Sequence, residues 1–122
     1  MMDSGLWGPH AWYFIESCAL NLNDTDTQSK NKFVEFLETL EFILPCENCR
    51  KKVSLYIKEH PIPTGTKDEI VNWVIDLHND VRRRCGKSQF TKSDVVNYYS
   101  KSHLLFPIVI LIFLVFLLSQ LF

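Results

Sequence analysis

The chain has 122 residues, enough for one domain, and carries 13 basic and 14 acidic side chains. This nearly neutral balance lacks the basic excess of a nucleic-acid-binding protein, so no nucleic-acid partner is expected. The N-terminus shows no apolar stretch of the signal-peptide kind, so a cytosolic setting is expected. Because the cytosol is reducing, the four cysteines indicate a redox or metal site rather than a disulfide framework.

Five segments have the spacing of apolar residues that is typical of amphipathic helices. Pro45 forces a break between the second and third segments, and Thr66 with Glu69 forms a capping box at the start of the fourth. No convincing alternating pattern of a strand is present. The sequence therefore predicts an all-α fold over residues 1–100, a four-helix bundle plus a short fifth helix. The expected helices cover residues 9–22, 29–43, 46–57, 66–86 and 91–99.

The C-terminal segment from Leu104 to Phe122 is almost wholly apolar and uncharged. As a helix it is about 28 Å long, close to the hydrocarbon thickness of a bilayer. It is too apolar on all sides for a domain of this size to bury, so residues 104–122 are predicted to be a C-terminal transmembrane helix. Lys101 precedes it and no charge follows it, which predicts a single-pass membrane protein whose domain faces the cytosol.

Two thiols stand three residues apart in the stretch from Leu44 to Arg50. Cys46 and Cys49 lie on one face at the start of the third helix, so their sulfurs can form a bond. The positive end of the helix, Arg50 and the two lysines that follow all favour the thiolate form. Such a pair can cycle between dithiol and disulfide.

Three interpretations of this pair remain open on the residues alone. A zinc site needs two further ligands, which His10, His60, His78 or His103 could supply. A thioredoxin-like site needs a βαβ context that the helical pattern does not offer. The third is a dithiol that works against a cofactor bound inside the helical bundle.

A second group of polar residues lies at the end of the fourth helix. His78 and Asn79 can stack on or hydrogen-bond a heterocycle. The cations that follow can hold a pyrophosphate by charge-assisted bonds, although a solvated basic turn explains them equally well. These cations are Arg82, Arg83, Arg84 and Lys87.

Taken in order, these groups resemble a known family over roughly residues 5–100. The motifs are Trp7-Gly8-Pro9, Trp12, Leu44-Pro45-Cys46-x-x-Cys49, Trp73, His78-Asn79-x-Val81 and Gly86-Lys87-x-x-Phe90. This order is similar to that of the Erv/ALR family of FAD-linked sulfhydryl oxidases, especially the short forms of large DNA viruses.

The resemblance implies a helical bundle with FAD at its mouth, and a homodimer. It implies that Cys46 is the outer sulfur attacked by substrate and that Cys49 lies nearest the flavin. Glu16 stands where the family usually has histidine, and Arg82 where it usually has asparagine. A carboxylate there needs a cationic partner, Arg82 or another group. The residues expected to contact FAD are Trp12, Glu16, Cys49, His78, Asn79, Val81, Arg82, Lys87 and Tyr99.

The implied function is an FAD-dependent thiol oxidase that forms protein disulfides and passes electrons through flavin to O2, giving H2O2. Its expected partner is a protein dithiol, either thioredoxin-like or a viral relay protein, and its expected location is a virion or an internal membrane of the host. No metal is expected in this interpretation. The alternative is a membrane-tethered zinc-binding or adaptor module without catalysis, with Cys46 and Cys49 closed around the metal.

Overall fold

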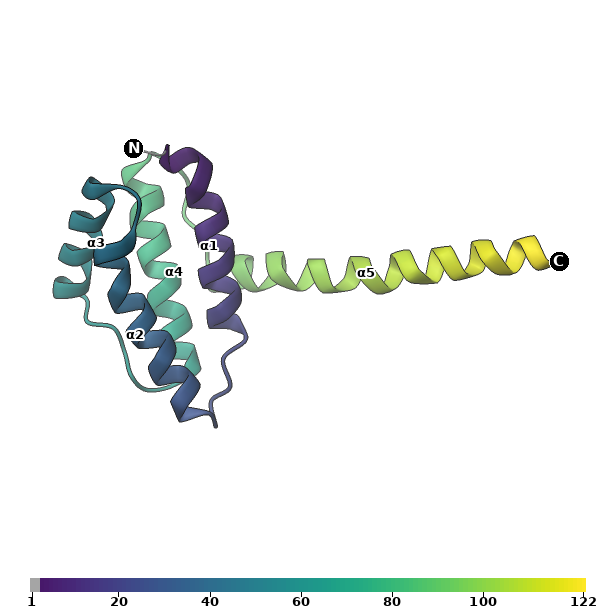
Figure 1. Cartoon of the computed structure of the whole chain (residues 1–122), viewed down its shortest axis with the longest axis horizontal. Helices are drawn as coiled ribbons and strands as arrows, with labels where there is room; N and C mark the ends of the chain where they lie inside the picture. Colours follow the sequence, from purple (N-terminus) through teal and green to yellow (C-terminus); the bar gives the residue numbers. More distant parts are fainter. Residues whose placement is uncertain (1–2) are drawn as a thin grey trace. The chain divides into compact units, whose positions relative to one another are not determined.

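The computed structural model describes residues 3–122, except that the side chains of residues 101–106 lie outside the description. Within this range every regular element is helical, so the all-α prediction is confirmed. The helices are α1 (Ser4–Leu20), α2 (Thr27–Ile43), α3 (Glu47–Glu59), α4 (Lys67–Arg84) and α5 (Lys92–Leu121) (Figure 1). The chain divides after Gln89 into two units, α1 to α4 in the first and α5 in the second.

Helix α1 begins at Ser4, five residues before the predicted start at Pro9. The side chain of Asp3 accepts a hydrogen bond from the backbone N–H of Gly5 at 2.9 Å, which caps the helix earlier than the proline signal indicated. Pro9 consequently lies inside α1 and leaves one backbone hydrogen bond unmade. The helix ends at Leu20, where the side chain of Asn21 donates to the carbonyl of Ser17 at 2.7 Å.

Helix α4 has the capping box that the sequence predicts. The Glu69 N–H donates to the Thr66 hydroxyl at 3.3 Å, and the Thr66 N–H donates to Oε2 of Glu69 at 2.9 Å. The other end of α4 closes at Gly86, whose φ of 70° lies in the left-handed region that favours glycine. The N–H of Lys87 then donates to the carbonyl of Arg82 at 2.9 Å.

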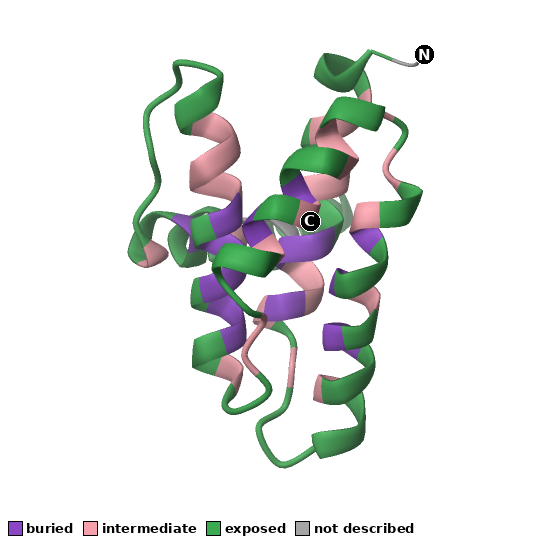
Figure 2. Ribbon diagram, turned by 90° about the vertical axis from the view of Figure 1, so that its left-hand side faces the viewer, coloured by how far each residue is buried: buried purple, intermediate pink, exposed green. Residues whose placement is uncertain are grey.

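The core of the first unit lies where the four helices face one another. Leu37 of α2 and Ile70, Val74 and Leu77 of α4 are its largest fully buried side chains. Figure 2 shows the buried positions on the inward sides of the helices. Their removal from water is the main source of stability for a bundle of this size.

Helix α5 forms the second unit and runs without interruption for 30 residues. The predicted boundary between a short fifth helix ending near Tyr99 and a separate terminal helix is therefore wrong, because no glycine or proline stands between them to end the helix. Its capping box is formed by Thr91 and Asp94, and Pro107 lies inside it. Among the residues that the structure describes, no helix is both long enough and apolar enough to cross a membrane. The predicted anchor at 104–122 begins with three residues whose side chains lie outside the described set.

Candidate redox site

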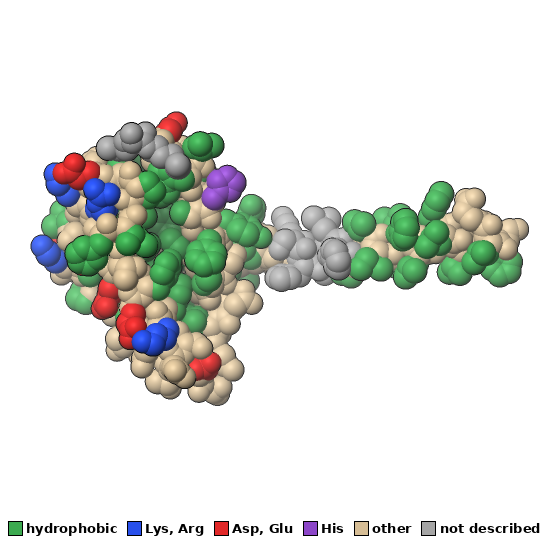
Figure 3. Space-filling view, in the orientation of Figure 1, with side chains coloured by type: hydrophobic (Ala, Val, Ile, Leu, Met, Phe, Trp, Pro, Cys, Tyr) green, Lys and Arg blue, Asp and Glu red, His purple; other side chains and the backbone are tan. Residues whose placement is uncertain are grey.

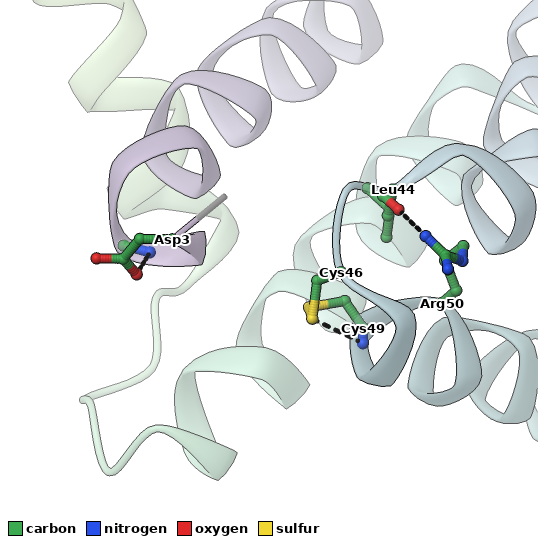
Figure 4. Close-up of a disulfide and its surroundings, with 6 residues drawn as sticks. Asp3, Leu44, Cys46, Cys49 and Arg50 are labelled. Carbon is green, nitrogen blue, oxygen red and sulfur yellow. Dashed lines mark hydrogen bonds between the residues drawn. A yellow bond between two sulfur atoms is a disulfide. The ribbon is translucent and has the colours of Figure 1, made fainter. Parts of the chain in front are cut away.

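The redox site is built on the turn between α2 and α3. Pro45 ends α2, so the chain turns and restarts at Glu47 with Cys46 as the N-cap residue of α3. Cys49 is then the third residue of α3, on the same face as Cys46. The two cysteines form a disulfide with their Cα atoms 5.1 Å apart (Figure 4).

Local hydrogen bonds direct positive charge toward this pair. The backbone N–H of Cys49 donates to Sγ of Cys46 at 3.2 Å. Both sulfurs also lie in the first turn of α3, at the positive end of the helix. Negative charge on either sulfur is therefore stabilised when the bond between them opens.

Two of the nearby cations, Arg50 and Lys51, interact with groups other than the two sulfurs. Arg50 donates from Nη1 to the carbonyl of Leu44 at 2.5 Å, which holds the turn before Cys46 in place (Figure 4). Lys51 forms an exposed ion pair with Glu47 at 2.9 Å, and this hydrogen bond is the main cause that lowers the pKa of Glu47. Arg50 thus supports the geometry of the turn, while the charge of Lys51 is largely offset by Glu47.

A second cluster joins α1 to α4 and contains three of the residues predicted to bind FAD. Oε1 of the buried Glu16 lies 2.5 Å from Nδ1 of His78. The His78 ring stacks on Trp12 with ring centroids 4.1 Å apart and planes inclined by 7°. Because a carboxylate accepts hydrogen bonds, this contact assigns Nδ1 of His78 as the donor.

In the structure the partner of Glu16 is His78. The sequence predicted a cation for this role, Arg82 or another group. Arg82 donates from Nε to the carbonyl of Ser88 at 2.5 Å. Glu16 is therefore accommodated within the bundle by a buried carboxylate–imidazole pair.

The remaining predicted FAD residues are distributed around the end of α4 and on α5. Asn79 lines a groove between α3 and α4. Val81 is half-buried, and its carbonyl accepts from the N–H of Cys85. Lys87 is exposed just past the Gly86 turn. Tyr99 lies on α5 in the second unit, with its ring edge-on to Tyr98, so its contact with FAD stays a prediction.

Trp7 is a candidate that the sequence-based FAD set omitted. Among the described residues, its indole Nε1 is the buried side-chain polar atom that has no hydrogen-bond partner. A buried donor of this kind needs an acceptor, and the carbonyl oxygens of a flavin are suitable acceptors. The only signal in the sequence was its place in the Trp7-Gly8-Pro9 motif.

The side chains fit a flavin nucleotide. The Trp12–His78 stack offers a flat aromatic edge, the indole N–H of Trp7 requires an acceptor, and Arg82 and Lys87 offer positive charge for a diphosphate. They fit a zinc ion poorly, because the sulfurs of Cys46 and Cys49 are bonded to each other. Across the described residues, no three histidine, cysteine or acidic side chains gather as metal ligands do.

The two other cysteines lie outside these clusters. Cys18 is half-buried on α1, and burial raises the pKa of its thiol, which makes it a poor nucleophile. Cys85 is exposed at the end of α4.

Comparison with known proteins places this geometry in a family. The sequence pattern of the Erv1 / Alr family matches residues 9–100. A probable FAD-linked sulfhydryl oxidase of Acanthamoeba polyphaga mimivirus is 26% identical over 106 residues, which cover 83% of this chain and 73% of that protein. The FAD-linked sulfhydryl oxidase of an African swine fever virus isolate is 30% identical over 98 residues, covering 79% of this chain and 82% of that protein.

A solved structure has the same fold. The crystal structure of the FAD-binding domain of Erv1 from Saccharomyces cerevisiae aligns with a TM-score of 0.68 at 29% sequence identity. The alignment covers 75% of this chain and 88% of that one.

Proposed function

This chain belongs to the Erv1 / Alr family, and on that premise we propose that it is an FAD-dependent thiol oxidase that forms protein disulfides. The observation that carries the proposal is the Cys46–Cys49 disulfide in the first turn of α3. Both viral and cellular relatives are named FAD-linked sulfhydryl oxidases. The zinc-binding or adaptor alternative is not favoured, because the two sulfurs are bonded to each other.

The exchange step uses the two sulfurs in different roles. A substrate thiolate attacks Sγ of Cys46, a new sulfur–sulfur bond forms, and the Cys46–Cys49 bond breaks with Cys49 leaving as a thiolate. The second substrate thiolate then attacks the substrate sulfur of this mixed disulfide and displaces Cys46 as a thiolate. The substrate loses two electrons and two protons, and the cysteine pair gains the two electrons. Each leaving sulfur lies at the positive end of α3, and the N–H of Cys49 points at Cys46.

FAD, when bound, would supply the two-electron redox chemistry that links the reduced pair to O2, whose reduction product is H2O2. The residues proposed to hold it are those of the predicted set, with Trp7 added. Glu16 and Trp12 orient the His78 ring between α1 and α4. Arg82 and Lys87 supply charge for the diphosphate, and Cys49 is the sulfur proposed to lie nearest the ring system.

Oxygen uptake by the purified full chain tests this function. Addition of a small dithiol such as dithiothreitol is expected to consume O2 and release an equal amount of H2O2. Cys46→Ser and Cys49→Ser are expected to abolish this turnover, whereas Cys85→Ser, which removes an exposed thiol outside the pair, is expected to preserve it. Turnover that survives in Cys49→Ser contradicts the proposal.

A homodimer formed through α1 and α2 fits the surface of the first unit. Large apolar side chains are exposed on these two helices, and Figure 3 shows hydrophobic side chains gathered on one face of the unit (Figure 3). We name these residues the α1–α2 apolar face; they are Leu6, Tyr13, Phe14, Phe42 and Ile43. An apolar surface of this kind is stabilised when a second copy covers it.

The C-terminal segment is proposed to anchor the protein in a membrane, with the first unit on the cytosolic side. The support is the uncharged apolar sequence from Leu104 to Phe122, together with Lys101 before it. The full chain is expected to float with phospholipid vesicles. It is also expected to stay bound to them after a wash with alkaline carbonate. A chain that stays in the aqueous fraction contradicts the anchor and leaves the oxidase proposal untouched.

A further inference from the structure

A groove of about 650 Å³ lies between α3 and α4. Asn79, one of the residues proposed to contact FAD, lies in its lining, and the other lining residues have no role in the proposed chemistry. From α3 it is lined by Lys52, Leu55, Tyr56, Glu59 and His60. From α4 and the turn after it, the lining residues that matter here are Asp76, Asp80, Arg83 and Arg84. We propose that this groove binds an extended segment of the protein substrate and thereby presents the substrate's cysteines to Cys46; the inference rests on the proposed function.

The groove has a defined direction relative to the disulfide. Trp73 donates from Nε1 to the carbonyl of His60 at 2.8 Å, which joins the end of α3 to the first half of α4. From that point α4 continues toward Arg83 while α3 leads back toward Lys52, so the two helices run antiparallel along the groove. Lys52 lies three residues after Cys49, one turn along the same face of α3. One end of the groove therefore lies about one turn from the redox pair, and the His60 end lies farther away.

The two ends carry opposite charge. Lys52, Arg83 and Arg84 line the end nearer the disulfide, where the single Asp80 carboxylate pairs with both arginines. Three cations against one anion leave this end positive. Glu59 and Asp76 line the far end and, among the residues the structure describes, neither has an ion-pair partner. The groove is thus positive beside the disulfide and negative beyond it.

The floor between the charged ends is apolar. Tyr56 is buried there, with its ring stacked on His60, while Leu55 is 56% exposed. Burial and the nearby Asp76 and Asp80 carboxylates raise the pKa of Tyr56, so its hydroxyl stays neutral and can donate a hydrogen bond. An exposed leucine flanked by charged side chains offers contact to an apolar side chain of a bound peptide.

These features define the substrate class. Glu59 lies seven positions after Lys52, about 10 Å along the helix, which an extended chain spans in about three to four residues. The preferred substrate segment carries acidic residues next to its cysteines and basic residues about four positions away. Charge complementarity of this kind raises the rate of productive encounter and is weakened by salt.

Two synthetic dithiol peptides test this preference with the full-length protein. They share cysteine spacing and composition and differ only in the order of the charged blocks, either acidic next to the cysteines and basic beyond or the reverse. The wild type is expected to oxidise the first with a kcat/KM about tenfold higher at low salt, and the difference is expected to shrink at high salt. Serine-for-cysteine versions of both peptides give the binding preference independently of turnover.

The double variant Glu59→Lys, Asp76→Lys removes the negative end without touching the redox pair. It is expected to lose the preference for the first peptide while it oxidises dithiothreitol as the wild type does. The matched control, Glu35→Lys with Glu38→Lys on the exposed side of α2, makes the same change in net charge and is expected to keep the preference.

The outcomes separate the groove from the oxidase function. Equal kcat/KM and equal binding for the two peptides, or a double variant that keeps the preference, overturns the groove proposal. Loss of flavin from the double variant also overturns it, because the groove then belongs to the cofactor site. A wild type that binds the peptides with the expected preference but oxidises no dithiol refutes the proposed function and leaves the binding groove supported.

Discussion

Glu16 on α1 and His78 on α4 connect two helices of the bundle through a contact of 2.5 Å between Oε1 and Nδ1. The side chains are 7% and 13% exposed, so the pair is almost withdrawn from water. The Trp12 ring stacks on the imidazole ring of His78 and fixes its plane. A buried carboxylate costs free energy unless it is paired, and this pairing explains how the bundle accommodates Glu16.

Substitutions at Glu16 are expected to reduce stability in a graded order. Glu16→Leu leaves the Nδ1 proton of His78 without this acceptor and is expected to cost about 2 kcal/mol of unfolding free energy. Glu16→Gln keeps a neutral acceptor and should cost less. Urea denaturation of the two variants measures the difference, and the fraction of FAD retained on purification is expected to follow the same order. Glu38→Gln, at an exposed position of α2, is the control and should stay within about 0.5 kcal/mol of the wild type. Equal stability of all three variants argues against a structural role for the pair.

The start of α4 depends on Thr66. Its hydroxyl accepts from the N–H of Glu69, so Thr66→Ala is expected to lower the unfolding free energy by about 1 kcal/mol. Thr64→Ala, two residues earlier in the same exposed loop, is the matched control and should have little effect. Thermal or urea unfolding distinguishes the two, and equal losses in both variants indicate a loop effect instead of a cap.

Stability in acid is expected to depend on Asp24. The N–H of Lys67 donates to this carboxylate at 2.6 Å and is the main cause that holds the pKa of Asp24 below its ordinary value of 3.8, with a further contribution from Lys30. Because the folded-state pKa is lowered, the group stabilises the fold above its unfolded-state pKa, and this contribution is lost as the pH falls through the folded-state value. Asp24→Asn should therefore lower the Tm at neutral pH, and the gap should close below about pH 4. A gap that persists unchanged in stronger acid contradicts this assignment.

The α1–α2 apolar face is expected to control assembly. Phe42 is 73% exposed, so Phe42→Asp should convert a homodimer to a monomer without unfolding the bundle. Leu55→Asp introduces the same charge at an exposed apolar residue of α3 that is not part of this face, and it is expected to leave the dimer intact. Sedimentation velocity in detergent measures both. A dimer that survives Phe42→Asp, or a wild type that is monomeric, refutes this interface.

The sequence indicated much of this structure because local signals set it. The Thr66–Glu69 box, the break at Pro45 and the stop at Gly86 depend on residues within a few positions of one another, and all three are present in the structure. The start of α1 was missed because the cap at Asp3 outweighs the proline signal at Pro9. The end of the fifth helix was missed because no residue there interrupts the helical backbone.

Contacts between distant segments were less accessible. The cysteine pair was predicted because its two residues are adjacent on one helix face. The choice of His78 as the partner of Glu16 depends on how α1 packs against α4, sixty-two residues apart in the chain. The unpartnered indole of Trp7 and the charge order of the α3–α4 groove likewise arise from packing, which no motif encodes.

The central claim is that electrons pass from a substrate dithiol through Cys46 and Cys49 to a bound flavin. Its most direct test follows the blue absorbance of the purified full chain after a dithiol is added without oxygen. The wild type is expected to be yellow, to bleach, and to recover its colour when O2 is admitted, whereas Cys49→Ser should be equally yellow and fail to bleach. A colourless wild-type protein, or a Cys49→Ser variant that bleaches as fast as the wild type, contradicts the claim.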